Sequence, residues 1–413
     1  MKQSSWQSTG GFLLAAVGSA IGIGNLWRFP ALCANYGGGT FIIVFLALLI
    51  PISLPLMLAE FSLGQKGGGD IPHCFAVCGR SKAWGLLGLL PICAAFLVLA
   101  VYLPVGGWIS GFMLASLRFA PPAADYFSSL SLISPYSMAL LWGILLLIAL
   151  TIGRGLTEGV EKLSKLLIPI LFLLLCGLAV YACCLPNSDS GLKMLFSFNP
   201  DLVNSELLTV ALGQVFYSLS LGMGINIAYG AFLPPRFKLR LCATLIAAFA
   251  ACSAILSSFI IIPAATAFNL PLQAGTSLLF VSLPHIFCQI GGLTGAVFSA
   301  LFFFLAFIAA YTSACALLEV CAAPLLRVFK RPYAVAIAAL TVGAAGTLLA
   351  ASFAAQGQIF AAFDNWAAHI LMPAAALTLC LFAGLIWREG FGKITRFMLA
   401  FILPVLILIC LML

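Results

Sequence analysis

The sequence predicts an all-α polytopic membrane protein. Of its 413 residues, 63% are hydrophobic and only 7% are charged, which is too little charge for a soluble surface. Apolar runs of roughly 20 residues recur from one end of the chain to the other, and each is long enough to cross a bilayer as a helix. The short alternating strands that are typical of a membrane β-barrel do not occur.

Eleven such runs predict eleven transmembrane helices. Their approximate limits are residues 8–33, 37–64, 84–118, 136–153, 160–184, 205–233, 239–267, 294–327, 333–352, 357–387 and 394–412. The connection at residues 268–293 is apolar but contains two prolines, and it is too broken to span the bilayer. It is therefore expected to form a re-entrant or lid-like hairpin.

The distribution of basic residues predicts the orientation of these spans. With the limits above, every Lys and Arg except Arg28, Arg118 and Lys193 falls on one side of the membrane. The positive-inside rule makes this side cytoplasmic, which puts the N-terminus inside and, after eleven crossings, the C-terminus outside. Topology thus accounts for the net charge of +8, and no nucleic-acid partner is expected. Nothing in the sequence sets the oligomeric state.

Two spans contain residues that suit a continuous membrane helix poorly. The first holds GSAIGIGNLWRFP (residues 18–30) and the sixth holds SLSLGMGINIAYG (residues 218–230). Close helix packing would account for the glycines but not for Asn25 and Arg28, because polar residues within a span are costly and usually functional. Interrupted helices that open two halves of five spans point to a transporter site, where freed carbonyls bind a cation and half-helix N-termini face an anion.

These motifs carry a resemblance to a known family. The first span, NYGGGTF (residues 35–41) and PLMLAEFSLGQ (residues 55–65) closely resemble the opening of the neurotransmitter:sodium symporters. GQVFYSLSLGMG (residues 213–224) resembles their sixth helix, and AYTSACALLE (residues 310–319) resembles their eighth.

The resemblance implies the leucine-transporter-type fold with unwound helices 1 and 6. This fold consists of two inverted repeats of five helices, here residues 1–184 and 205–387, followed by helix 11 at residues 394–412. It also implies a bacterial amino-acid transporter in the plasma (inner) membrane.

The same resemblance implies a sodium-coupled symporter that imports a neutral, hydrophobic or aromatic L-amino acid by alternating access. Amine-transporting relatives have an aspartate at the position of Gly22, so glycine implies that the substrate brings its own carboxylate. A proton-coupled transporter on the same fold, using Glu60 or Glu319, is the alternative. An enzyme is not expected, because the three histidines fall in separate places, and nothing suggests the continuous polar pore of a channel.

The family's substrate site maps onto twelve residues of this chain. The carboxylate is expected at the amides of Ile23 and Gly24 and the hydroxyl of Tyr102. The ammonium is expected at the carbonyls of Ala20, Tyr217 and Ser218 and the hydroxyl of Ser220. The side-chain pocket would be lined by Ser19, Val98, Met223, Ser313 and Leu317, none of which is charged.

Two sodium sites follow from the resemblance. The second site would use the carbonyls of Gly18, Ile21 and Ala309 and the hydroxyls of Thr312 and Ser313. The first would use Ala20, Asn25 and Ser218, and it is expected to be weaker because Phe249 stands where the family supplies an asparagine. Gln214, Ser218 and Ser253 match the family's chloride site, but Phe45 replaces its tyrosine, so the sequence does not decide whether chloride is used.

The family's gates are matched in part. Arg28 and Asp364 would form a water-bridged outer ion pair with Tyr217 as a lid, and Phe280 would help to cover the cavity. Asp364 has the alternative of merely starting a helix at the interface. At the inner gate Trp6 is retained, but Gln3 and Arg327 replace the expected basic and acidic residues, so the cytoplasmic latch must differ. Glu60 is expected to bond the unwound backbone of helix six, and Glu319 could be structural or carry a proton.

Overall fold

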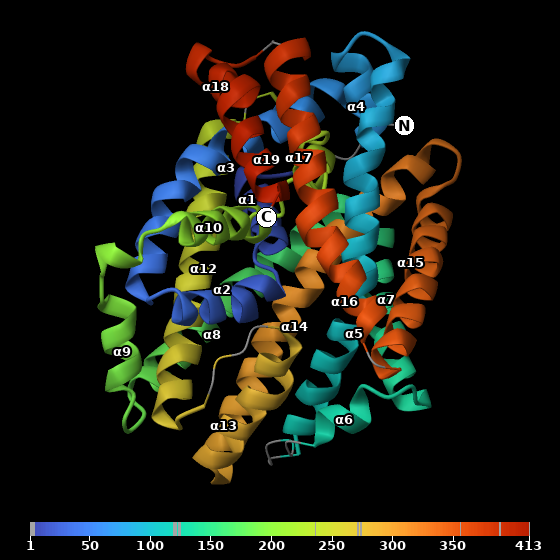
Figure 1. Cartoon of the computed structure of the whole chain (residues 1–413). Helices are drawn as coiled ribbons and strands as arrows, with labels where there is room; N and C mark the ends of the chain where they lie inside the picture. Colours follow the sequence, from blue (N-terminus) through green and yellow to red (C-terminus); the bar gives the residue numbers. More distant parts are fainter. Residues whose placement is uncertain are drawn as a thin grey trace.

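The computed structural model describes residues 5–118, 122, 125–235, 237–270, 272, 275–355, 357–387 and 390–412. Within these ranges every regular element is helical. Figure 1 shows a bundle of long helices, with the N-terminus, α4 (Ile71–Cys78) and α18 (Lys393–Phe397) at one end. The opposite end carries α6 (Tyr126–Leu130), α9 (Asp189–Phe196) and α13 (Leu283–Ile290). The chain thus forms one helical bundle whose two ends carry different short helices.

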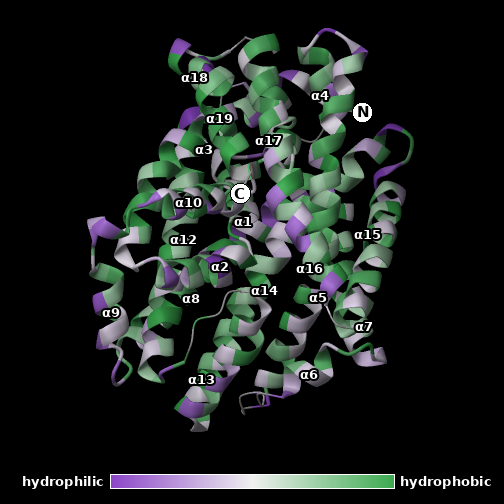
Figure 2. Cartoon of the chain, in the orientation of Figure 1, coloured by the Kyte–Doolittle hydropathy of each residue, from purple (hydrophilic) through white to green (hydrophobic). Residues whose placement is uncertain are grey.

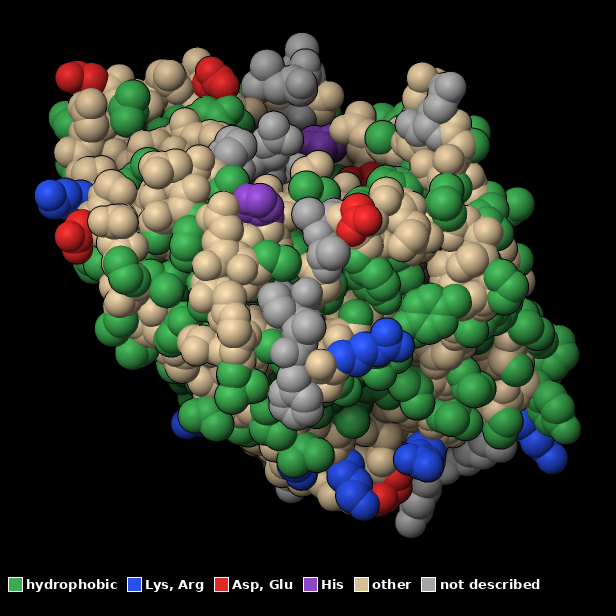
Figure 3. Space-filling model, turned by 90° about the horizontal axis from the view of Figure 1, so that it is seen from below, with side chains coloured by type: hydrophobic (Ala, Val, Ile, Leu, Met, Phe, Trp, Pro, Cys, Tyr) green, Lys and Arg blue, Asp and Glu red, His purple; other side chains and the backbone are tan. Residues whose placement is uncertain are grey.

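Hydropathy along this bundle fits a membrane environment. Figure 2 shows hydrophobic residues over most of the length of the helices, and many of the hydrophilic residues lie near the two ends. The end that carries α6, α9 and α13 is mostly hydrophobic or uncharged, and few charged side chains interrupt it (Figure 3). The chain is a multi-pass membrane protein.

Eight helical segments of the described chain are long and apolar enough to cross a membrane. They are α3 (Gly39–Gly67), η1–α5 (Lys82–Ser116), α7 (Pro135–Gly153), η2–α8 (Leu156–Cys183), α12 (Leu239–Ala267), α14–η5 (Gly292–Arg327), α15 (Arg331–Ala354) and α16–η6–α17–η7 (Gln358–Trp387). The pair α1 (Thr9–Ala20) and α2 (Ile23–Asn35), bent by 53°, makes a ninth candidate. The remaining predicted spans coincide with α10 (Ser205–Ser218) plus α11 (Ile225–Gly230) and with α18–η8–α19 (Lys393–Met412). The count of eleven crossings stays a prediction.

The connection predicted as a hairpin is helical. Its π-helical turn η4 (Leu278–Ser282) runs into α13, and the two together are apolar but too short to span a membrane. Two glycines with positive φ, Gly291 and Gly292, reverse the chain into α14, against which α13 packs.

The first break lies between α1 and α2, where the backbone leaves the helical region at Ile21 (ψ 78°) and Gly22 (ψ 178°). The second break is longer and runs from residue 219 to residue 224 between α10 and α11. Ser220, Gly222 and Gly224 have φ of 53°, 81° and 72° there. Side chains are disfavoured at positive φ, so the two glycines adopt these angles readily, whereas Ser220 holds its angle despite its side chain. Both predicted interruptions are therefore present.

Candidate functional site

The two breaks meet at one cavity inside the bundle. It is lined by Ser19, Ala20, Gly22, Gly24, Asn25, Val98, Tyr102, Tyr217, Ser220, Met223, Ile225, Ser313, Leu317 and Met372, which come from α1, α2, α5, α10, α11, α14, α17 and the breaks. Of the predicted substrate-binding residues, only Ile23 and Ser218 are absent from this lining. Sequence positions about 300 residues apart are thus brought together by the fold.

Two lining residues, Ile225 and Met372, were not predicted. Ile225 begins α11 directly after the second break, so its place within the glycine-rich motif of residues 218–230 was a usable signal. Met372 begins α17, directly before Pro373, so the proline within this span was a usable signal for a change in the helix, although it does not point to the cavity. Its contribution comes only from tertiary packing.

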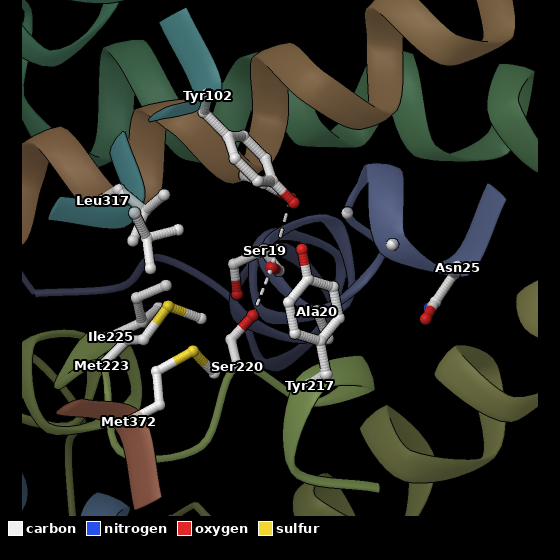
Figure 4. A pocket seen from close by; sticks show the side chains of 14 residues that line it. Ser19, Ala20, Asn25, Tyr102, Tyr217, Ser220, Met223, Ile225, Leu317 and Met372 are labelled. Carbon is white, nitrogen blue, oxygen red and sulfur yellow. Dashed lines mark hydrogen bonds between the residues drawn. The ribbon is translucent and has the colours of Figure 1, made fainter. Parts of the chain in front are cut away.

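The cavity has a polar end and an apolar end. Figure 4 shows Ser19 and Ala20 beside the first break, with the hydroxyls of Tyr102 and Ser220 pointing toward Ser19, and Asn25 farther away on α2. The side chains of Met223, Ile225, Leu317 and Met372 gather on the other side. No charged side chain belongs to the lining. This arrangement suits a small ligand with one polar end and one apolar end.

Glycine is required at two places in the polar end. A Cβ on Gly22 would lie 2.8 Å from the Tyr102 hydroxyl and 3.4 Å from the Ser313 hydroxyl. A Cβ on Gly24 would lie 1.9 Å from Cε1 of Tyr217. Any side chain at these positions would therefore enter the space of the tyrosines and narrow the cavity.

Five oxygens converge beside the cavity where α1 approaches α14. The Thr312 hydroxyl donates to the Gly18 carbonyl (2.9 Å) and lies 3.4 Å from the Ala309 carbonyl. The Ser313 hydroxyl lies 3.3 Å from the Gly18 carbonyl and 3.4 Å from the Ile21 carbonyl. These are the five groups predicted for the second sodium site. A buried set of neutral oxygens suits a hard cation, and the described residues contain no His, Cys, Asp and Glu cluster that would suit a softer metal.

A second polar cluster lies around Asn25 of α2, where α2, α10 and α12 meet. The Asn25 side-chain amide donates to the Ser253 hydroxyl (3.2 Å), and the Gln214 amide donates to the Ser218 hydroxyl (2.9 Å). The carbonyl oxygens of both amides are buried without a hydrogen-bond partner in the described chain. Buried acceptors are rarely left unpaired, so these two oxygens are available to a donor or a cation. The predicted first sodium ligand Asn25 is one of them.

Helix α12 does not supply an amide oxygen to this cluster. Phe249, at the position where the family supplies an asparagine, is 38% exposed and packs edge-on against Phe172 with ring centroids 5.3 Å apart. The helix presents Ser253 to Asn25 instead. Phe45 is fully buried against Phe29 and carries no hydroxyl toward the cluster.

Tyr217 lines the cavity, and Arg28 lies over its ring. The guanidinium carbon of Arg28 lies 5.1 Å from the centre of the Tyr217 ring, and Nη2 lies 3.3 Å from Nε2 of His369. The described residues show no direct hydrogen bond or ion pair between Arg28 and Asp364. The direct partner of Arg28 is thus His369, which was not among the predicted gate residues.

Phe280 lies elsewhere than predicted. It is fully buried and absent from the cavity lining. Its ring stacks on Phe127 at 4.9 Å and also contacts Trp108 and Phe112. The physical reason is that η4 packs its aromatic face onto α5 and the α6 segment, so Phe280 joins the hairpin to α5 and does not cover the cavity.

Glu60 organises the second break. Its carboxylate accepts the Gly222 backbone N–H (3.1 Å) and the Asn226 amide (2.7 Å), and all of these groups are buried. The expectation that Glu60 bonds the unwound backbone is therefore confirmed.

The other buried carboxylate, Glu319, is held in a bidentate pair by Arg331, with distances of 2.8 and 2.9 Å. Arg331 also donates to the Ile152 carbonyl. A bidentate ion pair of this kind is the geometry expected if Glu319 is structural.

The end of the bundle next to the N-terminus is tied by contacts that differ from the family pattern. The Trp6 indole donates to the Tyr229 carbonyl (3.0 Å). Arg327, which stands where an acid was expected, forms an ion pair with Asp70 at the start of α4. Gln3 lies outside the described residues.

Comparisons with known proteins agree with this geometry. The sequence profile described as "Sodium:neurotransmitter symporter family" matches residues 3–129 and 130–412. An uncharacterized sodium-dependent transporter of Bacillus subtilis (strain 168), YhdH, is 30% identical over 92% of this chain and 87% of its own length. The mouse sodium-dependent neutral amino acid transporter B(0)AT3 is 29% identical over 57% of this chain and 43% of its own length. The crystal structure of MhsT in complex with L-phenylalanine matches with a TM-score of 0.89 and 30% identity over 99% of both chains.

Proposed function

The chain belongs to the sodium:neurotransmitter symporter family, and from that premise we propose that it is a sodium-coupled symporter for a neutral, hydrophobic or aromatic L-amino acid. Members of this family are secondary transporters, so the chain is not an enzyme. The two-ended cavity at the meeting of the breaks is the observation that carries the proposal.

The polar end of the cavity suits an α-amino acid head group. The helix α2 begins at Ile23, and its first N–H groups favour a carboxylate, with the Tyr102 hydroxyl beside them. The ammonium would meet the carbonyls and the Ser220 hydroxyl at the second break. Gly22 leaves no acidic side chain for an amine without a carboxylate. The apolar end, which includes Met223 and Leu317, would take an uncharged side chain.

Sodium would bind at the five oxygens between α1 and α14. An ion held by Gly18, Ile21, Thr312 and Ser313 would fix the end of α1, whose next residues line the cavity. Ser313 belongs to both the oxygen cluster and the cavity lining. Ion and substrate would therefore each lower the cost of ordering the site for the other, which is coupling in the thermodynamic sense.

We propose that the first sodium site, at Ala20, Asn25 and Ser218, is weak or remodelled. The support is that α12 brings no amide oxygen to this site: Phe249 packs against Phe172, and the residue that α12 places at Asn25 is Ser253. The substrate carboxylate would be the remaining anionic ligand at this site.

Alternating access would follow from the repeats proposed at residues 1–184 and 205–387, each opened by a broken helix. Arg28 and Tyr217 would close the outer side. We place the protein in a bacterial plasma membrane with the N-terminus in the cytoplasm, in accordance with the basic residues of its connecting segments.

Uptake into proteoliposomes tests the proposal. Radiolabelled alanine, leucine, phenylalanine, tryptophan, glutamate and lysine are presented with an inward Na⁺ gradient, an inward K⁺ gradient or an inward proton gradient without Na⁺. We expect leucine, phenylalanine or tryptophan to accumulate only with Na⁺, and glutamate and lysine not to accumulate. Accumulation driven by protons without Na⁺ would instead support the proton-coupled alternative.

A further inference from the structure

Met372 lines the cavity from α17, a helix that does not flank either break. It is the first residue of α17 and follows the π-helical turn η6 (Trp366–Leu371). Its side chain is 2% exposed and lies beside Met223 at the apolar end of the cavity (Figure 4). Two thioethers from separate elements therefore face the same space.

The backbone at Met372 is held in place by the second break. A Cβ added to Gly222 would lie 2.3 Å from the Met372 carbonyl oxygen and 3.1 Å from the Ala376 nitrogen. The N–H of Gly222 is in turn held by Glu60. Because α17 and the break are in such close contact, the main chain at this end of the cavity has little room to move, whereas the methionine side chain keeps three rotatable bonds.

The free space in the cavity is small. Its free volume is about 20 Å³, which is room for about one water molecule. A substrate side chain must therefore displace groups at the apolar end. Val98 and Leu317 are branched and packed in long helices, so the unbranched methionines are the groups that can yield.

We propose that Met372 sets the largest amino-acid side chain that the cavity accepts. Together with Met223 it forms an adjustable end wall: the thioethers fold over a small side chain and swing aside for an aromatic one, whose ring gains contacts with sulfur. This inference rests on the proposed function, because it concerns the substrate of the same site.

Substitutions of Met372 that change its volume in opposite directions test the inference. Dissociation constants for alanine, leucine, phenylalanine and tryptophan are measured by isothermal titration of purified full-length protein in saturating NaCl. Met372→Ala is expected to raise the affinity for tryptophan relative to leucine roughly tenfold, and Met372→Phe to lower it by a similar factor, since such pockets discriminate about 10- to 200-fold per methylene. Met372→Leu keeps the volume but loses the sulfur, so the preference for phenylalanine over leucine should fall about two- to tenfold.

Met57→Ala is the matched control. Met57 is also fully buried in a membrane helix, α3, but it is absent from the cavity lining, so all affinity ratios should stay at the wild-type values. Unchanged ratios in the three Met372 variants, with wild-type protein that binds amino acids, would overturn the role of Met372 and leave the proposed function standing. Wild-type protein that binds none of the four amino acids in NaCl would overturn the proposed function itself. If Met372→Ala or Met372→Phe fails to fold, the isosteric Met372→Leu variant still decides the sulfur contribution.

Discussion

At this site, single side chains connect one helix to another by hydrogen bonds. The Thr312 hydroxyl lies 3.0 Å from the Ile308 carbonyl of its own helix and 2.9 Å from the Gly18 carbonyl of α1. A threonine in a membrane helix commonly bonds only its own backbone. Here the second contact turns an ordinary hydroxyl into a bridge between α14 and the end of α1.

Replacement of this hydroxyl should weaken sodium binding. Thr312→Val keeps the shape but removes one oxygen of the cluster, and hydrogen bonds or ligands to a charged group contribute about 1.5–3 kcal/mol. We expect the Na⁺ concentration for half-maximal substrate binding to rise roughly ten- to hundredfold. Thr341→Val is the control, because that hydroxyl bonds only carbonyls of its own helix α15. If both variants need the same Na⁺ concentration for half-maximal substrate binding, Thr312 is not a sodium ligand.

Gly22 gives a second prediction at this scale. Gly22→Ala would place a methyl group 2.8 Å from the Tyr102 hydroxyl and reduce the polar end of the cavity. Binding of every amino acid should weaken by at least roughly tenfold, because the head group is common to all of them. Gly10→Ala in α1 has nothing within 4 Å of the new methyl group and should bind as the wild type does. Isothermal titration with leucine and alanine distinguishes a general loss from a change in selectivity.

The residues of the site could be predicted where a sequence motif identifies them. They were missed where only the packing of distant helices brings a side chain to the site. Ser220 and Leu317 lie in the family motifs, Tyr102 was predicted from the family's substrate site, and all three line the cavity. His369 was not selected as the partner of Arg28, although Asp364 lies only one and a half turns earlier in the chain. The π-helical turn at Trp366–Leu371 widens the helix there, so side chains after Asp364 face directions that a regular helical register does not give.

At the scale of elements, the glycines in the sequence predicted where both helices are interrupted. They did not predict how many residues each break contains. The first break is two residues long, whereas the second takes six and needs an external support. Glu60 of α3 gives that support by accepting from Gly222 and Asn226. A carboxylate buried among apolar helices is costly unless its hydrogen bonds are made, so the break and Glu60 stabilise one another.

Glu60→Gln should therefore destabilise the second break. The neutral amide accepts with one oxygen only and places an NH₂ group against another donor, and the loss of buried bonds to a charged acceptor costs about 1.5–3 kcal/mol per bond. We expect a lower thermal unfolding temperature in detergent and loss of leucine binding. Glu206→Gln changes an exposed carboxylate that bonds Tyr36, and its effect on stability should stay within about 0.5 kcal/mol. A Glu60→Gln protein as stable as Glu206→Gln would show that the break supports itself.

For the whole molecule, the end of the bundle near the N-terminus is closed by contacts that join α1 to α8. Glu161, in the π-helical turn η2 (Leu156–Glu161), accepts from the Gln7 backbone (3.1 Å) and the Ser8 hydroxyl (3.0 Å) and pairs with Lys165. Its carboxylate also occupies the space beside Gly11. One buried acid thus holds the first helix in place, where the family pattern had suggested an ion pair of another kind.

Loss of this anchor should free the first helix. Glu161→Gln weakens two hydrogen bonds and the ion pair, so hydrogen–deuterium exchange of peptides covering residues 5–20 should accelerate by roughly tenfold. Glu158→Gln lies in the same turn but is exposed, and exchange should stay within about twofold of the wild type. Added Na⁺ should slow exchange in both variants, because the proposed sodium site lies at the other end of α1. Equal acceleration in both variants would contradict the anchoring role of Glu161.

The number of sodium ions moved per substrate follows from the whole arrangement of helices. The cluster between α1 and α14 brings five oxygens together, whereas α12 turns Phe249 away from Asn25 and offers only Ser253. We therefore expect one tightly coupled Na⁺ per amino acid. In proteoliposomes held at zero membrane potential, net flux should stop when the opposing amino-acid gradient equals the sodium gradient. If net flux instead stops when the amino-acid gradient equals the square of the sodium gradient, two sodium ions are coupled. The first site would then bind sodium without an asparagine from α12.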